Sequence, residues 1–299
     1  MITLMLFFLV TYVLYRRVFY YSPKKRVNPA EIPDDELYRD HKDKLMAAID
    51  DMEKAEWTDA VIASEDGEVL AGRYLLTGPG RPLVLFLHGY HGTYMWDGYG
   101  CYRICRKLGY NVLMVDERAH GQSSGHTITF GVKECRDCLS WIAYAKEHIE
   151  YSKLYLWGVS MGAATVLDAS RHLGCDEVAG IISECAYTSP EAVIRRTGYA
   201  MGIPIGFLFP GVRAAAAVFG HFKLSAESPV EAVRNTDIPI LFIHGEKDGF
   251  VPYKMSEILY DACSSPKRIA GIADSGHAVC ALCNPDAYRT AVEDFLNEY

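Results

Sequence analysis

Short apolar runs alternate with longer amphipathic stretches over most of the chain, and this alternation predicts an α/β sheet. Two strands at 58–64 and 69–76 flank a Glu-Asp-Gly turn and are typical of a hairpin. Amphipathic segments between the later apolar runs predict helices, and right-handed crossovers through them make the strands parallel. These later strands are expected at 82–88, 111–116, 153–158, 178–183, 238–244 and 267–272. The pattern therefore predicts a mostly parallel eight-stranded sheet with helices on both faces.

The first 21 residues follow a different pattern. Residues 1–15 carry no charge, and the basic residues Arg16 and Arg17 come only after them. A cleaved signal has basic residues before its apolar run and small residues after it, so we predict an uncleaved membrane anchor at 1–21 instead. Basic residues on the C-terminal side place the rest of the chain in the cytoplasm. An interfacial or buried helix is the alternative, because fifteen residues span roughly 22 Å of a hydrocarbon core of about 30 Å.

The remaining chain divides into a connecting region and one large domain. Residues 22–57 are interpreted as a proline-containing linker, at 22–33, followed by a charged helix at 34–56. Residues 58–299 form the α/β domain. An insertion at about 188–237 is too long for a plain crossover and is rich in apolar residues, so we predict that it forms a cap over the functional site. Ordinary helix packing on the sheet and a second membrane contact are the alternatives.

The composition bears on whether the protein binds nucleic acid and on whether its compartment is reducing. The 299-residue chain is 50% hydrophobic and has a formal net charge of −8, which argues against a nucleic-acid partner. Nine cysteines, an odd number, favour free thiols in a reducing compartment over a disulfide framework. Nothing in the composition indicates an oligomeric state.

The strand predicted at 153–158 runs into Gly158-Val159-Ser160-Met161-Gly162. This G-x-S-x-G pattern between a strand and a helix is typical of a nucleophile elbow. The two glycines allow a sharp turn, so that the hydroxyl of Ser160 projects from its apex. We predict Ser160 as a catalytic nucleophile; a serine in the same turn of a noncatalytic protein is the alternative.

A serine nucleophile requires a base and an acid, which follow it along the chain in the order acid, then histidine. Asp248 comes just after the strand at 238–244, at the carboxyl end where α/β sheets collect functional side chains. His277 lies in the loop after the last predicted strand. We therefore predict Asp248 as the acid and His277 as the base, with Glu184 as an alternative acid.

The oxyanion of an acyl-transfer reaction is expected to bind two backbone N–H groups. Met161 follows the nucleophile and supplies the first. Tyr90 lies in the glycine-containing turn 88–92 after an early apolar strand, so its N–H is the expected second donor.

Five motifs give the chain a resemblance to the α/β-hydrolase superfamily over roughly residues 58–299. In chain order they are HGYHG (88–92), DERAHGQS (116–123), GVSMG (158–162), HGEKD (244–248) and SGH (275–277). Within the superfamily the chain is similar to bacterial membrane-anchored or secreted hydrolases grouped with serine-aminopeptidase-like and monoacylglycerol-lipase-like domains. That similarity rests especially on SECAYTS (183–189) and FVP (250–252).

The resemblance implies the α/β-hydrolase fold and a structural role for Asp116 and Arg118, which tie together a strand-end loop. One position departs from the motif, because Ala119 stands where glycine is usual. Alanine costs little if the backbone angle there is ordinary, so we interpret Ala119 as a modest variation.

The expected activity is that of a serine hydrolase cleaving a carboxylic ester or thioester, with a small acyl ester or lipid-like molecule as substrate and without a cofactor. Peptidase, amidase or acyltransferase chemistry by the same triad is one alternative, and a catalytically silent, membrane-tethered binding protein is another. Substrate-binding residues are expected in the turn 88–92 (the oxyanion turn), the strand-end loops and the cap. They are Tyr90, His91, Tyr187, Phe207 and Phe250.

Two C-x-x-C pairs, at 135–138 and 280–283, could on spacing alone hold zinc. The first pair lies in an amphipathic helix, where small thiols pack well, and no glycines typical of a zinc knuckle surround either pair. We therefore predict no metal site.

Overall fold

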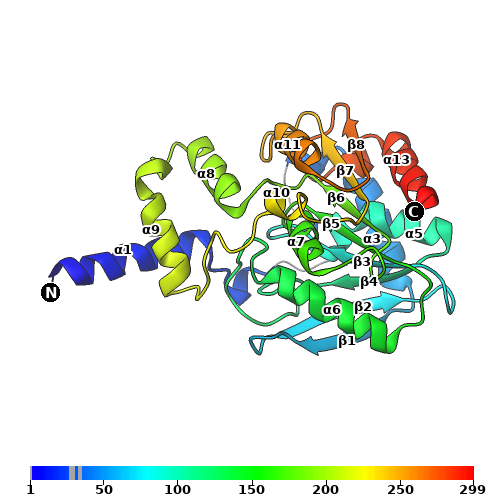
Figure 1. Cartoon of the computed structure of the whole chain (residues 1–299), viewed down its shortest axis with the longest axis horizontal. Coiled ribbons are helices and arrows are strands. Elements are labelled where there is room, and N and C mark those ends of the chain that lie inside the picture. The colour runs from blue at the N-terminus through cyan, green and yellow to red at the C-terminus, as the bar shows by residue number, and fades with distance from the viewer. Residues whose placement is uncertain (1, 27–30, 33–35) are drawn as a thin grey trace.

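Eight strands form one sheet in the computed structural model, which describes residues 2–26, 31–32 and 36–299 (Figure 1). The strands are β1 (Thr58–Ala63), β2 (Val69–Leu75), β3 (Leu83–Leu87), β4 (Asn111–Val115), β5 (Leu154–Val159), β6 (Gly180–Glu184), β7 (Ile240–Gly245) and β8 (Lys267–Ile272). Their spatial order is β1-β2-β4-β3-β5-β6-β7-β8. β2 pairs antiparallel with both β1 and β4, and the other neighbours are parallel. The predicted mostly parallel eight-stranded sheet is confirmed.

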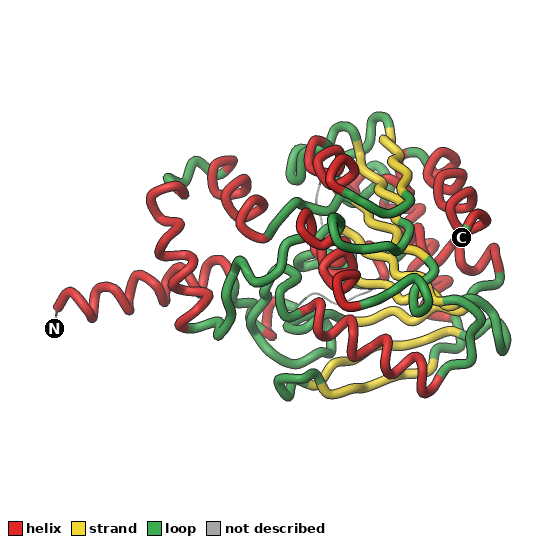
Figure 2. The backbone as a smooth tube through the Cα atoms, in the orientation of Figure 1, coloured by secondary structure: helices red, strands yellow, loops and turns green. Residues whose placement is uncertain are grey.

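The two faces of the sheet build two separate apolar cores. In β3, Val84 and Phe86 belong to one core, whereas Leu83, Leu85 and Leu87 belong to the other, as the two-residue period of a strand requires. Helices α3 (Lys42–Lys54), α5 (Tyr99–Leu108) and α13 (Pro285–Glu298) contribute to the first core. Helices α6 (Glu134–His148), α7 (Met161–Ala169) and α11 (Lys254–Ala262) contribute to the second. Figure 2 shows the strands between these helices.

The segment between β6 and β7 carries the helices of the predicted cap. They are α8 (Pro190–Ala200), α9 (Ile205–Val218) and the short α10 (Pro229–Ala232). In Figure 1, α8 and α9 lie to the left, beyond the ends of the strands, and α1 (Ile2–Val18) runs past α9. The remaining helices are short: η1 (Pro23–Lys25), α2 (Glu36–Arg39), α4 (Tyr94–Asp97), η2 (Ser170–His172) and α12 (Cys280–Cys283).

The predicted membrane anchor at 1–21 is wrong. No helix in the described part of the chain is both long enough and apolar enough to cross a membrane. Helix α1 has 17 residues, and Arg16 and Arg17 occupy its last turn. At ~1.5 Å per residue its length is roughly 26 Å, short of a hydrocarbon core of about 30 Å. The cytoplasmic placement deduced from the anchor and the membrane as a partner are withdrawn with it.

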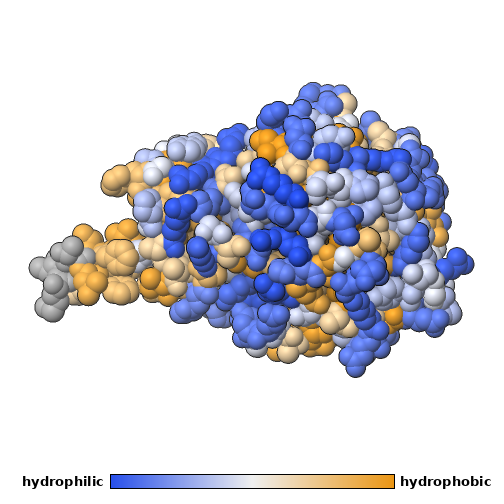
Figure 3. All heavy atoms as spheres, viewed as in Figure 1, coloured by the Kyte–Doolittle hydropathy of each residue, from blue (hydrophilic) through white to orange (hydrophobic). Residues whose placement is uncertain are grey.

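Helix α1 instead packs on the rest of the protein through its second half. Tyr12 and Tyr15 contact the ring of Phe219, just after α9, with centroid distances of 5.3 Å and 5.8 Å. Tyr15 and Phe19 are buried in a third apolar cluster together with residues of α9. Residues 4–10 of α1 are exposed and form the apolar projection in Figure 3.

The chain after α1 is hydrogen-bonded to the loop that follows β4. Ile128 N donates to Phe19 O, and Tyr21 N donates to His126 O, both at 2.8 Å. The guanidinium of Arg26 donates to the carbonyl oxygens of three residues farther back in that loop, namely Gly121, Ser123 and Gly125. The segment 2–26 is therefore joined to the sheet at several points.

The connecting region differs from the predicted linker and single helix. The charged segment forms two helices, α2 and α3, because Asp40 and His41 interrupt the helix between them. Of the predicted linker 22–33, residues 23–25 form η1, while 27–30 and 33 lie outside the described residues, as do 34 and 35 of the predicted helix.

The expectation of an ordinary backbone at Ala119 is also wrong. Its φ is +66°, in the left-handed region that glycine adopts without cost. Ala119 is fully buried, and its N–H donates to Ser124 O at 2.8 Å, which holds the loop in this conformation. Alanine therefore carries strain here of about 1–2 kcal/mol.

Candidate active site

Ser160 stands at the apex of the turn between β5 and α7. Its φ of 54° and ψ of −109° lie where residues with side chains are rarely found. Two backbone hydrogen bonds hold this turn: Ser160 N donates to Glu184 O at 2.8 Å, and Ala164 N donates to Ser160 O at 3.0 Å. The strained turn is thus fixed by β6 on one side and by α7 on the other.

Glycine is required on both sides of Ser160. A Cβ atom on Gly158 would clash with the carbonyl oxygen of Gly162, and one on Gly162 would clash with the carbonyl oxygen of Leu87. These contacts are with backbone atoms, which cannot rotate away as a side chain can. The close approach of β3, β5 and α7 at this turn therefore depends on the two glycines of the motif.

Ser160, His277 and Asp248 form one hydrogen-bonded chain. His277 Nε2 lies 2.9 Å from Ser160 Oγ, and His277 Nδ1 lies 2.6 Å from Asp248 Oδ2. The three residues follow β5, β8 and β7, whose carboxyl ends meet at one edge of the sheet. A hydroxyl, an imidazole and a carboxylate in this order have the geometry of a nucleophile, a base and an orienting acid.

The carboxylate of Asp248 is held from several directions. Its Oδ1 accepts hydrogen bonds from Phe250 N at 2.9 Å and Val251 N at 2.8 Å. His244, at the end of β7 and fully buried, has its Nε2 3.2 Å from Asp248 Oδ2. Burial alone would raise the pKa of Asp248, but the hydrogen bonds from His244 and His277 outweigh it and lower this pKa to about 2. Asp248 is therefore an ionised, positioned carboxylate at neutral pH.

Both predicted oxyanion donors are in segments next to Ser160: Met161 follows it in the chain, and a Cβ atom on Gly89, the residue before Tyr90, would lie 3.2 Å from Ser160 Cβ. Met161 is the first residue of α7, where N–H groups have no partner within the helix. Among the described residues, Tyr90 N donates to no acceptor. The neighbouring Gly89 N donates to the buried carboxylate of Asp97 at 2.6 Å, which fixes the start of the turn. Two backbone N–H groups are thus available beside Ser160.

The alternative acid, Glu184, is engaged elsewhere. Its Oε2 accepts a hydrogen bond from Tyr288 OH at 2.6 Å, on the side of the sheet covered by α13. Burial raises the pKa of Glu184. His277 Nδ1 donates its hydrogen bond to Asp248 and not to Glu184.

Two cavities meet at Ser160. The larger, of about 450 Å³, is lined in part by α8 and mostly by apolar side chains. The smaller, of about 220 Å³, is lined by the oxyanion turn and His277. A substrate with its carbonyl at Ser160 can therefore extend to both sides, with an apolar chain in the larger cavity.

Four of the five predicted substrate-binding residues line these cavities. Tyr90, Tyr187 and Phe250 line the larger one, while His91, with Tyr90, lines the smaller. Phe207, in the first turn of α9, lines neither and is 87% exposed.

Sequence reasoning missed the part that the N-terminal segment has in the site. Arg17 and Val18, at the end of α1, line the larger cavity together with Ser160. Tyr21 stacks on His91 at 4.0 Å between ring centroids, and His91 stacks in turn on Tyr90 at 3.9 Å. The aromatic and basic residues after the apolar run were the available signal, but the same composition is typical of a membrane interface.

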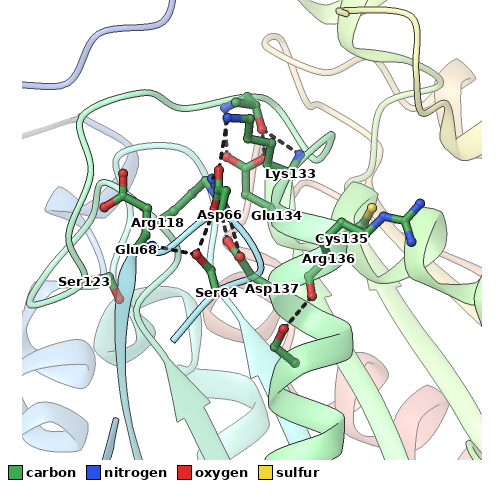
Figure 4. Close-up of polar contacts among 12 residues, drawn as sticks. Ser64, Asp66, Glu68, Arg118, Ser123, Lys133, Glu134, Cys135, Arg136 and Asp137 are labelled. Carbon is green, nitrogen blue, oxygen red and sulfur yellow. Dashed lines mark hydrogen bonds and ion pairs between the residues drawn. The ribbon is translucent and has the colours of Figure 1, made fainter. Parts of the chain in front are cut away.

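Arg118 lies in an ion-pair cluster away from the nucleophile (Figure 4). Its guanidinium donates to both carboxylate oxygens of Asp66 at 3.0 Å and to Asp137 at 2.6 Å. Asp116 Oδ2 accepts from Gln122 N at 2.9 Å within the same strand-end loop. These contacts join the loop to the β1–β2 hairpin and α6.

Among the described residues, one group of side chains is close enough to share a metal ion. The ligand atoms of Cys185, Asp248 and His277 lie within 4.8 Å of one another. Asp248 and His277 already hydrogen-bond to each other, and burial raises the pKa of Cys185, so its thiol stays protonated. The two C-x-x-C pairs lie on different helices, α6 and α12, and all nine cysteines are free.

Comparison with protein families matches two models. The model of the alpha/beta hydrolase fold family matches residues 82–219, and a serine hydrolase family model matches residues 203–282. Together they include Ser160, Asp248 and His277.

Comparison with known proteins gives relatives of the same kind. The chain is 28% identical to an uncharacterized protein, YqkD of Bacillus subtilis, over 88% of this chain and 87% of that one. It is 29% identical to a lysophosphatidylserine lipase, ABHD12 of Danio rerio, over 64% of this chain but only 50% of the lipase. The Pyrococcus furiosus esterase Pf2001 covers 91% of this chain and 99% of its own, with a TM-score of 0.66 at 21% identity, a likeness of fold alone.

Proposed function

Because this chain belongs to the α/β-hydrolase superfamily of serine hydrolases, we propose that it cleaves a carboxylic ester or thioester with Ser160, His277 and Asp248 as its triad. The observation that carries this proposal is the hydrogen-bonded chain from Ser160 Oγ to Asp248 Oδ2, placed where two cavities meet. The lysophosphatidylserine lipase among the similar proteins supports an ester over other acyl compounds.

The proposed reaction follows from the geometry. Ser160 Oγ attacks the acyl carbon while His277 Nε2 takes the hydroxyl proton, and the negative oxygen that forms is bound by Tyr90 N–H and Met161 N–H. Collapse expels the alcohol or thiol, which leaves with the proton from His277. Water then repeats the two steps on the acyl-enzyme, releasing the acid and restoring Ser160. Asp248 keeps the imidazole in the tautomer that can accept the proton at Nε2.

An acyl ester is favoured over a peptide by the chemistry of the larger cavity. Its lining contains apolar side chains and no aspartate or glutamate among the described residues, so nothing in it pairs with the α-amino group of a peptide. The triad itself is equally compatible with amidase or acyltransferase chemistry, so this preference rests on the cavity alone.

The test is hydrolysis of a p-nitrophenyl ester series from acetate to palmitate by wild type and by Ser160→Ala. We expect a loss of about 10³-fold or more in kcat/KM for the variant. Ser152→Ala, which removes an exposed serine upstream of β5, is the matched control and should be as active as wild type. Equal rates for wild type and Ser160→Ala would contradict the proposal, and no turnover of any ester by wild type would favour the silent binding protein.

A further inference from the structure

The larger cavity contains one charged side chain, and it comes from the N-terminal helix. Arg17 lines this cavity with Ser160, whereas the other lining residues are apolar or uncharged. Tyr187 also lines the cavity and is polar, but its hydroxyl already donates a hydrogen bond to Phe130 O at 2.9 Å. A cation at the wall of an apolar cavity that opens on the nucleophile is a candidate for substrate recognition.

Arg17 is placed by rigid neighbours. Phe19, two residues later, is 1% exposed and packs edge-on against Phe130 and Phe222, at 6.0 Å and 5.3 Å. Tyr15, two residues earlier, is also buried, and its hydroxyl lies 2.7 Å from Thr127 Oγ1. Because both flanking residues are fixed, the backbone at Arg17 and the direction of its Cα–Cβ bond are set before a substrate arrives.

The guanidinium of Arg17 has no partner in the described part of the chain, in contrast to its neighbours. Arg16 lies over the ring of Tyr20 at 3.7 Å, and Arg26 donates to loop carbonyls. Arg17 has neither an ion pair nor a hydrogen bond to any described residue. An unpaired guanidinium with five N–H donors matches a carboxylate or phosphate, which it can bind through two parallel hydrogen bonds.

We infer that Arg17 selects esters whose chain in the larger cavity carries an anionic group, a carboxylate or a phosphate-type anion, distant from the scissile bond. The apolar walls bind the chain, Ser160 attacks its carbonyl, and Arg17 binds the anion. This inference rests on the proposed function, because it needs an acyl carbonyl at Ser160. It makes the N-terminal helix a part of the substrate site.

The test compares matched esters that differ only in charge. p-Nitrophenyl hexanoate is neutral, and the mono-p-nitrophenyl ester of adipic acid has a chain of the same length ending in a carboxylate. The p-nitrophenyl ester of 5-phosphonopentanoic acid replaces that carboxylate with a phosphonate. p-Carboxyphenyl hexanoate places the anion on the leaving group instead. Each is assayed with wild type, Ser160→Ala, Arg17→Gln, Arg17→Lys and the matched control Arg16→Gln.

We expect Arg17→Gln to lower kcat/KM for an acid-ended ester about tenfold, while hexanoate changes less than about twofold. Whether adipate or phosphonate shows the larger loss identifies the anion. The preference for acid-ended esters over hexanoate should be kept in part by Arg17→Lys and in full by Arg16→Gln. Added salt should weaken the preference of wild type, because the guanidinium is exposed.

Four results would overturn the inference. An equal loss of kcat/KM on hexanoate and on the acid-ended esters would show that Arg17 only lines the cavity and does not bind an anion. A loss confined to p-carboxyphenyl hexanoate would mean that Arg17 binds an anion on the leaving group and not one on the acyl chain. If hydrolysis of hexanoate requires Ser160 but Arg17→Gln affects no ester, the inference is refuted and the proposed function stands. If hydrolysis of every ester proceeds without Ser160, the inference and the proposed function are both refuted.

Discussion

The buried imidazole of His244 lies 3.2 Å from Asp248, measured from Nε2 to the same Oδ2 that His277 approaches at 2.6 Å. Its other nitrogen, Nδ1, is 2.6 Å from Ser256 Oγ, and its Nε2 is also 2.8 Å from Val251 O. Because Val251 O can only accept, Nε2 carries a proton and is a donor toward both oxygens. His244 is therefore a positioning residue for the carboxylate that orients the base.

His244→Gln should lower kcat about tenfold with little change in KM. The reason is that Asp248 loses a partner that fixes its orientation, and small displacements of a catalytic group are costly. Steady-state kinetics on a p-nitrophenyl ester measures both parameters. His148→Gln, at an exposed histidine at the end of α6, is the control. An unchanged kcat in His244→Gln would show that Asp248 is held without it.

The low pKa of Asp248 predicts a loss of stability in acid. A carboxylate whose pKa falls from 3.8 to about 2 on folding stabilises the protein above the higher value. That contribution, about 2 kcal/mol, disappears as the pH falls through this window. Asp248→Asn cannot titrate, so its difference from wild type in free energy of unfolding should shrink between about pH 5 and about pH 2. Urea unfolding at each pH measures this, and a constant difference would contradict it.

Removal of the Tyr21 ring should weaken catalysis, although Tyr21 touches no reacting atom. It stacks on His91, whose φ is +57°, and His91 stacks on Tyr90 in the oxyanion turn. Without that support the turn is less well positioned, so Tyr21→Ala should lower kcat about tenfold, less than the loss of an oxyanion donor. Tyr21→Phe keeps the ring and should retain most of the activity. Similar kcat values in the two variants would refute a role for the stack.

Because the backbone at Ala119 is strained, Ala119→Gly should change the free energy of unfolding very little. Ala119→Gly relieves about 1–2 kcal/mol of backbone strain, which offsets the loss of a buried methyl and the added chain entropy. We expect its free energy of unfolding to stay within about 1 kcal/mol of wild type. Ala163→Gly, at a buried position in α7 without such strain, should cost about 2 kcal/mol. Equal losses in the two variants, measured by urea unfolding, would contradict the argument.

Local patterns were sufficient to predict the sheet and the chain of three polar side chains. Apolar runs bounded by turns identify the strands, and Ser160, Asp248 and His277 each follow one of them. Because the carboxyl ends of parallel strands share an edge, the topology brings these residues together without further information.

Contacts between distant segments could not be predicted in the same way. The apolar pattern of α1 is the same whether lipid or protein covers it, and here α9 covers its second half. The proximity of Arg17 to Ser160 depends on that packing. The positive φ of Ala119 did have a signal, because glycine is usual at this position of the motif, but alanine concealed it; the hydrogen bond from Ala119 N to Ser124 O holds the loop in this conformation.

Labelling by a fluorophosphonate probe, followed by mass spectrometry of the peptides, tests the catalytic role of Ser160 most directly. We predict a single adduct on Ser160 in the folded protein, no adduct in Ser160→Ala, and much slower labelling in His277→Ala, which lacks the base. A folded wild-type protein that takes up no probe, or takes it up at another residue, would contradict the account.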